Sequence, residues 1–201
     1  MEALINLLLR IPAIFIAITI HEFIRAFVST KLGDNIPKNE GRLTLNPLKH
    51  FEPIGFVIIF ATGGFGWGKP VNTSALYYKN RKKGILLTAI MPTVSNIILA
   101  FLFLLFYKFS FTLNISYLGT FFLYTATYNI GLAVYNLAPV PPMDCVKVLS
   151  AILPANTYFK YLQYEKIVQA VFLLLLFMGV SNYIFVPIIN LITNFFTFII
   201  F

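Results

Sequence analysis

The residues best suited to chemistry lie in ITIHEFIRAFVST, residues 18–30, a segment that is otherwise almost entirely apolar. His21 and Glu22 are followed by Arg25, so the spacing comes within one residue of H-E-x-x-H. In that pattern two histidines on one helix face bind zinc, and the glutamate acts as general base toward the metal-bound water. Arg25 stands at the position of the second histidine. The segment thus keeps one candidate ligand and the candidate base, and replaces the other ligand by a cation.

Arg25 changes what this site can hold. A guanidinium stays protonated, has no lone pair for a metal, and repels Zn²⁺. Charges inside an apolar span are normally paired or face water. We therefore predict that Arg25 pairs with Glu22, one turn away, and with Asp144, the acid that follows a later apolar run and a proline cluster. The alternative is that Arg25 extends toward the lipid headgroups near Lys31.

The composition is that of a membrane protein. Hydrophobic residues make up 59% of the 201 residues and charged residues only 11%, whereas soluble domains carry about 25% charged residues. The net charge of +8 does not predict nucleic-acid binding, because the basic residues lie in short loops between apolar runs. Cys145 is the only cysteine, which excludes an internal disulfide framework.

The elements that must position these residues are predicted from apolar runs, since a membrane-spanning helix needs about 20 mostly apolar residues. Candidate spans are residues 3–30, 84–107 and 117–137, with a long bent span or helical hairpin at 167–201 that is broken near residues 181–182 and Pro187. Residues 51–67 are too short and too rich in glycine to cross, so they are predicted to be re-entrant or a short hairpin. The expected fold is an all-α, multi-pass transmembrane helical bundle forming one membrane-embedded domain, 1–201. Its catalytic-type core would be about 3–150, followed by a C-terminal apolar span or helical hairpin at 165–201.

Charge counting predicts the orientation. The loops 31–50 and 68–83 contain nine basic residues, whereas 108–116 contains one. The positive-inside rule therefore places both basic loops in the cytoplasm, which requires that 51–67 does not cross. By alternation, the segment 139–166 falls on the same side and the N-terminus outside. We expect a multi-pass protein of the cell membrane with its site facing the cytoplasmic side.

Five short motifs occur together and in order along the first three quarters of the chain. They are HEF at 21–23, GRLTLNPLKH at 41–50, GFGWGKPV at 64–71, PTVSN at 92–96 and NLAPVPPMD at 136–144. This ordered set resembles the site-2 protease family of intramembrane zinc metalloproteases. It is most similar to the small bacterial branch that has no appended soluble domain.

The resemblance implies a three-span core in which two histidines and an aspartate hold zinc. A glutamate acts as base, and transmembrane protein substrates are cut near the cytoplasmic side. Carried over by position, His21 and Asp144 would be ligands and Glu22 the catalytic base. Asn136 would help to hold the substrate backbone, although Asn136 and Asn96 could instead be interhelical hydrogen-bond partners.

Three positions depart from the family pattern: Arg25, Met91 before a proline, and Cys145 after the aspartate. Only Arg25 affects the metal directly, and neither His50 nor Cys145 is expected to replace the lost ligand.

Two functions follow as hypotheses. One is a site-2-protease-like metallopeptidase with a degenerate zinc site and reduced activity. The other is a catalytically inactive relative that binds transmembrane partners without cleaving them. A transporter or proton relay is a more remote third.

Overall fold

The computed structural model describes residues 2–113 and 116–201, and every regular element in these two ranges is helical. In these ranges four helices precede a single 3-10 turn, and six helices follow it. Their bounds are α1 (Glu2–Lys31), α2 (Ile36–Asn39), α3 (Pro47–His50), α4 (Pro53–Thr62), η1 (Ala75–Tyr77), α5 (Arg81–Leu113), α6 (Ser116–Tyr135), α7 (Cys145–Ile152), α8 (Ala155–Gln163), α9 (Glu165–Phe177) and α10 (Ser181–Ile200). The predicted all-α class is confirmed.

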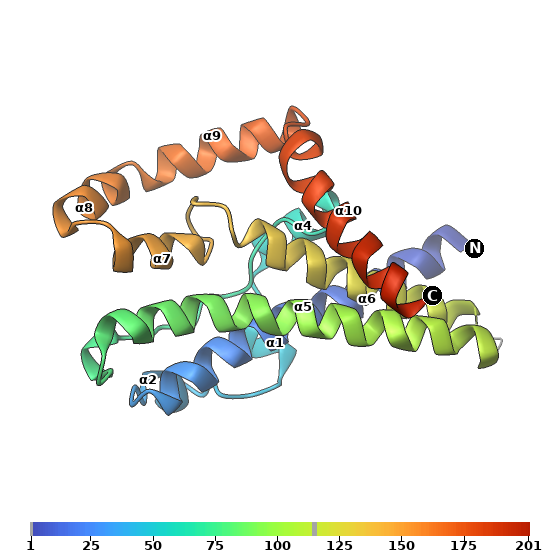
Figure 1. Ribbon diagram of the computed structural model, residues 1–201, viewed down its shortest axis with the longest axis horizontal. Coiled ribbons are helices and arrows are strands. Elements are labelled where there is room, and N and C mark those ends of the chain that lie inside the picture. Colours follow the sequence, from blue (N-terminus) through green and yellow to red (C-terminus); the bar gives the residue numbers. More distant parts are fainter. Residues whose placement is uncertain (1, 114–115) are drawn as a thin grey trace.

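Three helices in the described part of the chain are long and apolar enough to cross a membrane: α1, α5 and α10. Helices α1 and α5 lie side by side with α6 packed against both (Figure 1). Small residues of α1, such as Ala13 and Ala17, are completely or almost completely buried and lie in one core cluster with Tyr128 and Leu132 of α6. Small side chains allow the helices to approach closely, which is typical of packing in membranes.

Helix α6 coincides with the predicted third span and has 20 residues, but its composition does not single it out as a crossing helix. Its sequence includes Thr125 and Asn129, which lower its apolar character and are both fully buried. Both side chains are bonded inside the protein: Thr125 to a backbone carbonyl, and Asn129 to a carbonyl and to Asn96 of α5. Helix α6 is thus an internal helix of the bundle, and these two polar side chains face protein.

Residues 51–67 form a short helix followed by a return of the chain, which is the short hairpin predicted from their length. Helix α4 has 10 residues, which corresponds to about 15 Å, and it ends at Gly63 with φ +75°. The chain then returns, so that the Lys69 N–H donates to the His50 carbonyl at 2.8 Å. The return passes directly against α6, where the backbones of Gly64 and Gly131 leave no room for a Cβ at either position. The segment is a hairpin with both ends at one level.

The C-terminal region is formed by two helices that meet at an angle (Figure 1). The break was expected near residues 181–182 and at Pro187, but the turn lies at 178–180, with Gly179 at φ +85°. Pro187 lies inside α10 instead, as prolines in apolar helices often do. Phe172 of α9 and Phe185 of α10 pack on the same core cluster as Phe65, and this packing fixes the two helices on the bundle.

Candidate functional site

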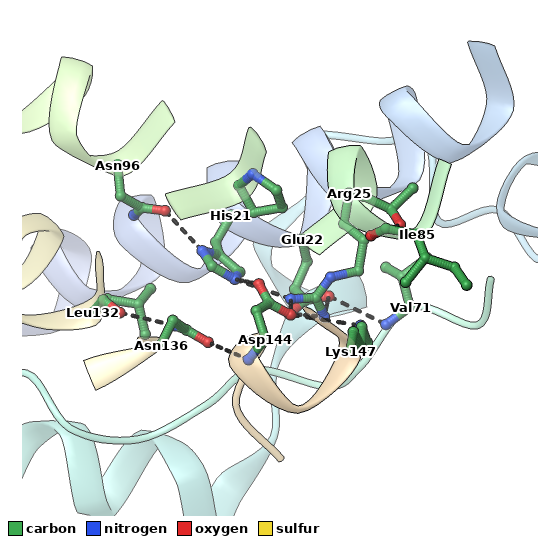
Figure 2. Close-up of polar contacts among 12 residues, drawn as sticks. His21, Glu22, Arg25, Val71, Ile85, Asn96, Leu132, Asn136, Asp144 and Lys147 are labelled. Carbon is green, nitrogen blue, oxygen red and sulfur yellow. Dashed lines mark hydrogen bonds and ion pairs between the residues drawn. The ribbon is translucent and has the colours of Figure 1, made fainter. Parts of the chain in front are cut away.

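The candidate site lies between α1 and the segment that joins α6 to α7 (Figure 2). His21, Glu22 and Arg25 occupy one face of α1 and are 3%, 4% and 3% exposed. Asp144, which is 2% exposed, immediately precedes α7. Its Oδ2 lies 3.0 Å from His21 Nε2, although the two residues are 123 positions apart. The fold therefore brings together the four residues on which the sequence prediction depended.

The guanidinium of Arg25 lies at the centre of this group (Figure 2). Its Nη1 is 3.0 Å from each carboxylate oxygen of Glu22. Its Nη2 forms a short ion pair with Asp144 Oδ1 and lies 3.0 Å from His21 Nε2. The predicted ion pairs with both acids are thus confirmed. The alternative, an arginine that extends to the headgroups, is wrong, because the side chain is buried.

The imidazole of His21 is held by a chain of asparagines. Asn96 Nδ2 donates to the carbonyl of Ala17 and to Asn129 Oδ1, so Asn96 Oδ1 must be the atom facing His21. His21 Nδ1 therefore donates to that oxygen at 2.8 Å. This arrangement directs Nε2 toward Arg25 Nη2 and Asp144 Oδ2, each 3.0 Å away. It is the same orientation that metal-binding histidines receive from their hydrogen-bonding neighbours.

Asn136 and the proline-rich turn hold Asp144 in place. The Asn136 Oδ1 accepts the backbone N–H of Asp144 at 3.2 Å, and its Nδ2 donates to the Leu132 carbonyl at 2.8 Å. Asp144 occupies the N-cap position of α7, yet its side chain makes no capping hydrogen bond. The carboxylate is directed instead at Arg25, with the Lys147 Nζ 3.5 Å away as a second cation. The assignment of Asn136 to substrate binding stays a prediction.

An extended segment, residues 67–74, runs along the other side of Glu22. The Val71 N–H donates to Glu22 Oε2 at 3.1 Å. Arg42 fixes this segment by donating to the carbonyls of Lys69 and Pro70 at 2.6 and 2.9 Å. At its far end, the buried Asp34 accepts the Ser74 N–H at 2.8 Å. Every bond to Glu22 therefore comes from a group of fixed position.

His50 supports the same segment, and both of its ring nitrogens contact groups outside the His21–Glu22–Arg25–Asp144 cluster. Its ring is fully buried, with Nε2 donating to the Thr44 carbonyl at 2.8 Å and Nδ1 3.4 Å from Arg42 Nη2. Burial lowers the pKa of His50, an effect that the Thr44 carbonyl opposes and the Arg42 charge adds to. The neutral imidazole accepts from Arg42, which in turn holds the two carbonyls.

These residues do not fit a catalytic zinc ion. Such an ion usually has three protein ligands, and here His21 Nε2 and the Asp144 carboxylate are the two donors that converge. The guanidinium of Arg25 contacts both donors and also occupies Glu22. Among the described residues, no group of three His, Cys, Asp or Glu side chains is placed to hold a metal. The guanidinium is a cation among these groups and provides no donor atom for a metal.

The remaining space at the site is small. A cavity of about 20 Å³ borders His21, Glu22, Arg25 and Asn136, which is room for about one water molecule. The Arg25 Nε–H is buried without a protein hydrogen-bond partner. A peptide backbone does not fit in a cavity of this size.

Sequence reasoning missed several supporting groups. The Val71 N–H cannot be found from residue identity, because every non-proline residue carries the same backbone donor. Asn129 gave no signal beyond being a polar residue in an apolar run. Lys147, three residues after Asp144, could have been found from helical spacing.

Comparisons with known proteins give three similar sequences. The Bacillus subtilis (strain 168) protein named "Putative zinc metalloprotease YwhC" is 33% identical over 184 residues, covering 88% of this chain and 84% of that protein. A Mycolicibacterium smegmatis protein, "Putative zinc metalloprotease Rip2", is 32% identical over 149 residues, 68% of this chain and 54% of its own length. Its Mycobacterium tuberculosis namesake is 29% identical over 168 residues, 82% and 64% of the two chains. No protein-family model and no solved structure matches.

Proposed function

This chain belongs to the zinc metalloprotease family of these relatives, and we propose that within it the chain is a site-2-protease-like membrane protein whose metal has been replaced by Arg25. In this proposal the protein binds transmembrane segments of partner proteins and does not hydrolyse them. The observation that carries the proposal is the guanidinium placed among His21, Glu22 and Asp144. Arg25 stands at the position where the family pattern has the second zinc-binding histidine.

The guanidinium can replace the charge of zinc but not its chemistry. A bound zinc supplies a Lewis acid and lowers the pKa of its water to about 7. Arg25 remains protonated and cannot bind a water oxygen as a Lewis acid would. It also occupies both carboxylate oxygens of Glu22, the residue that would accept the proton of the attacking water. The site thus has neither an activated nucleophile nor a free base.

The partner class and the orientation rest on sequence. The five family motifs predict a binding place for transmembrane protein segments, and the nine basic residues of 31–50 and 68–83 predict that it opens toward the cytoplasm. Large apolar side chains exposed along α5, among them Ile98, Leu102 and Phe106, support immersion in lipid. We expect one membrane-embedded unit with several crossings.

A second candidate function is intramembrane peptide hydrolysis, and the preserved surroundings of residue 25 favour it. His21 already has the orientation of a ligand, Asp144 faces it at 3.0 Å, and Glu22 is adjacent. All that the arrangement lacks is a donor at position 25. Hydrolysis would therefore require either a replaced residue 25 or displacement of its side chain.

The two functions are separated by cleavage of a membrane-embedded reporter peptide in reconstituted vesicles. We expect the unsubstituted chain to bind the reporter without cleaving it, and Arg25→His to cleave it. The matched control is Arg25→His with Glu22→Gln, which keeps the donors and removes the base, and which we expect to be inactive. Equal cleavage by the unsubstituted chain and Arg25→His would overturn our account of residue 25. Absence of cleavage by both, with binding retained, would favour the binding protein.

A further inference from the structure

A second polar hollow lies where α1 ends and α5 begins, and it shares no residue with the site described above. Its volume is about 420 Å³, within the range of small-molecule sites. Two segments line it, the end of α1 and the entry to α5. The lining residues are Lys31, Leu32, Gly33, Lys79, Asn80, Lys83, Gly84 and Leu87.

The charge of this hollow is uncompensated. Lys31, Lys79 and Lys83 come from separate parts of the two segments, and none of the residues that line the hollow is acidic. Among the ion pairs of the described residues, none involves these three lysines. The buried Asp34 forms no ion pair with them, and its carboxylate accepts hydrogen bonds from Ser29 and two backbone N–H groups. Lys31 Nζ lies 5.5 Å from the centre of the Phe27 ring. Three ammonium groups around one hollow repel each other unless an anion lies between them.

The position of the hollow indicates which anion fits. Lys31 is the last residue of one apolar helix and Lys83 lies in the first turn of another. Two such helix ends lie side by side at one end of the molecule (Figure 1), a level that in a bilayer corresponds to the phosphate groups. The start of α5 adds the positive end of a helix dipole, and Leu32 and Leu87 give the hollow an apolar floor.

We propose that this hollow binds a phosphate group, carried by an anionic phospholipid or free in solution, with Lys31, Lys79 and Lys83 as its cationic donors. The proposal is independent of the chemistry at residue 25. A phosphate bound here would connect the end of α1 to the start of α5, two turns beyond Arg25.

The lipid test uses the full chain in nanodiscs that contain phosphatidylcholine and phosphatidylglycerol. Bound lipid is then identified by native mass spectrometry. We expect the unsubstituted protein to retain phosphatidylglycerol preferentially, and K31Q/K79Q/K83Q to lose the preference by roughly fivefold for each lysine removed. The control K38Q/K49Q/K160Q removes the same charge from exposed positions elsewhere and should keep the preference. If the triple variant does not fold, K79Q alone, on an exposed loop, should show the fivefold loss.

A second arm distinguishes the source of the phosphate. Thermal unfolding is measured in nanodiscs of phosphatidylcholine alone, with inorganic phosphate or with chloride at equal ionic strength. Stabilisation by phosphate that K31Q/K79Q/K83Q abolishes identifies free phosphate as a ligand. Retention of phosphatidylglycerol without this stabilisation identifies the headgroup. Equal loss in the two triple variants, or no preference in either arm, would overturn the proposal.

Discussion

At the scale of single residues, the site is a balanced set of charges. Arg25 and Lys147 face Glu22 and Asp144, and His21 Nε2 lies 3.0 Å from both Arg25 Nη2 and Asp144 Oδ2. A buried ion pair gains little net stability over an apolar replacement, but removal of one partner leaves an uncompensated charge and is costly. The contribution of Arg25 to stability is therefore best measured as the free energy lost when its removal leaves the carboxylates of Glu22 and Asp144 unpaired.

We expect Arg25→Leu to destabilise the protein by about 3–5 kcal/mol, because two buried carboxylates lose their main cation. Removing the acids as well, in the variant Arg25→Leu, Glu22→Gln and Asp144→Asn, should restore most of that loss. Unfolding in mixed detergent, followed by circular dichroism, gives both free energies. An unchanged stability of Arg25→Leu would mean that the ion cluster does not hold α1 to α7.

A pH effect is expected from His50. Burial holds its pKa below the ordinary value of about 6.5, so the folded protein takes up a proton less readily than the unfolded chain does. Stability should therefore be full above about pH 6.5 and fall as the pH drops from there toward the folded pKa. The measurement is the midpoint temperature of thermal unfolding across this pH range.

His50→Gln keeps a donor for the Thr44 carbonyl but does not titrate, so it should lose this part of the pH dependence. The same slope in both proteins would rule out His50.

The sequence could predict the charged residues of the site, but it could not predict the hydrogen bonds that hold them in place. The pairing of Arg25 with two acids followed from the cost of an intramembrane charge, and the position of Asp144 followed from the proline break and the family pattern. The bonds from Val71 and from the Asn129–Asn96 chain depend on tertiary contacts between α1, α5, α6 and the segment 67–74. No local pattern determines those contacts.

At the scale of elements, segment length and glycine content predicted which segments form a hairpin, but they did not predict where each helix begins and ends. The hairpin at 51–67 was predictable because 17 residues with Pro53 and several glycines cannot form a crossing helix. The break between α9 and α10 was misplaced by a few residues, because a proline in an apolar helix does not have to end it. Helix termini depend on packing as well as on local composition.

The contact between the hairpin and α6 gives an element-scale prediction. A Cβ on Gly131 would lie 2.7 Å from the Gly64 Cα, so Gly131→Ala must move the hairpin away from the bundle. We expect a loss of about 1–3 kcal/mol, the usual cost of overpacking. Thr127→Ala, on the exposed face of the same helix, is the control and should change stability by less than about 0.5 kcal/mol. Equal free energies of unfolding for the two variants would show that the hairpin can move away from α6 without loss of stability.

At the scale of the whole molecule, the basic loops predict the orientation. In a background in which Cys145 is replaced by serine, Lys82→Cys should react with a membrane-impermeant maleimide only when the cytoplasmic face is accessible. Lys108→Cys, close to the other end of α5, should react only from the outside. Labelling of both positions from one side would contradict the predicted topology and the cytoplasmic position of the site.

At the same scale, we propose that an internal cation, the Arg25 guanidinium, takes the place of zinc in this protein. The most direct measurement is the zinc content of protein purified with zinc present, determined by inductively coupled plasma mass spectrometry for the unsubstituted chain and for Arg25→His. We predict that the unsubstituted chain retains far less than one zinc per molecule, while Arg25→His, with three donors, retains about one. Tightly held, stoichiometric zinc in the unsubstituted chain would contradict the account.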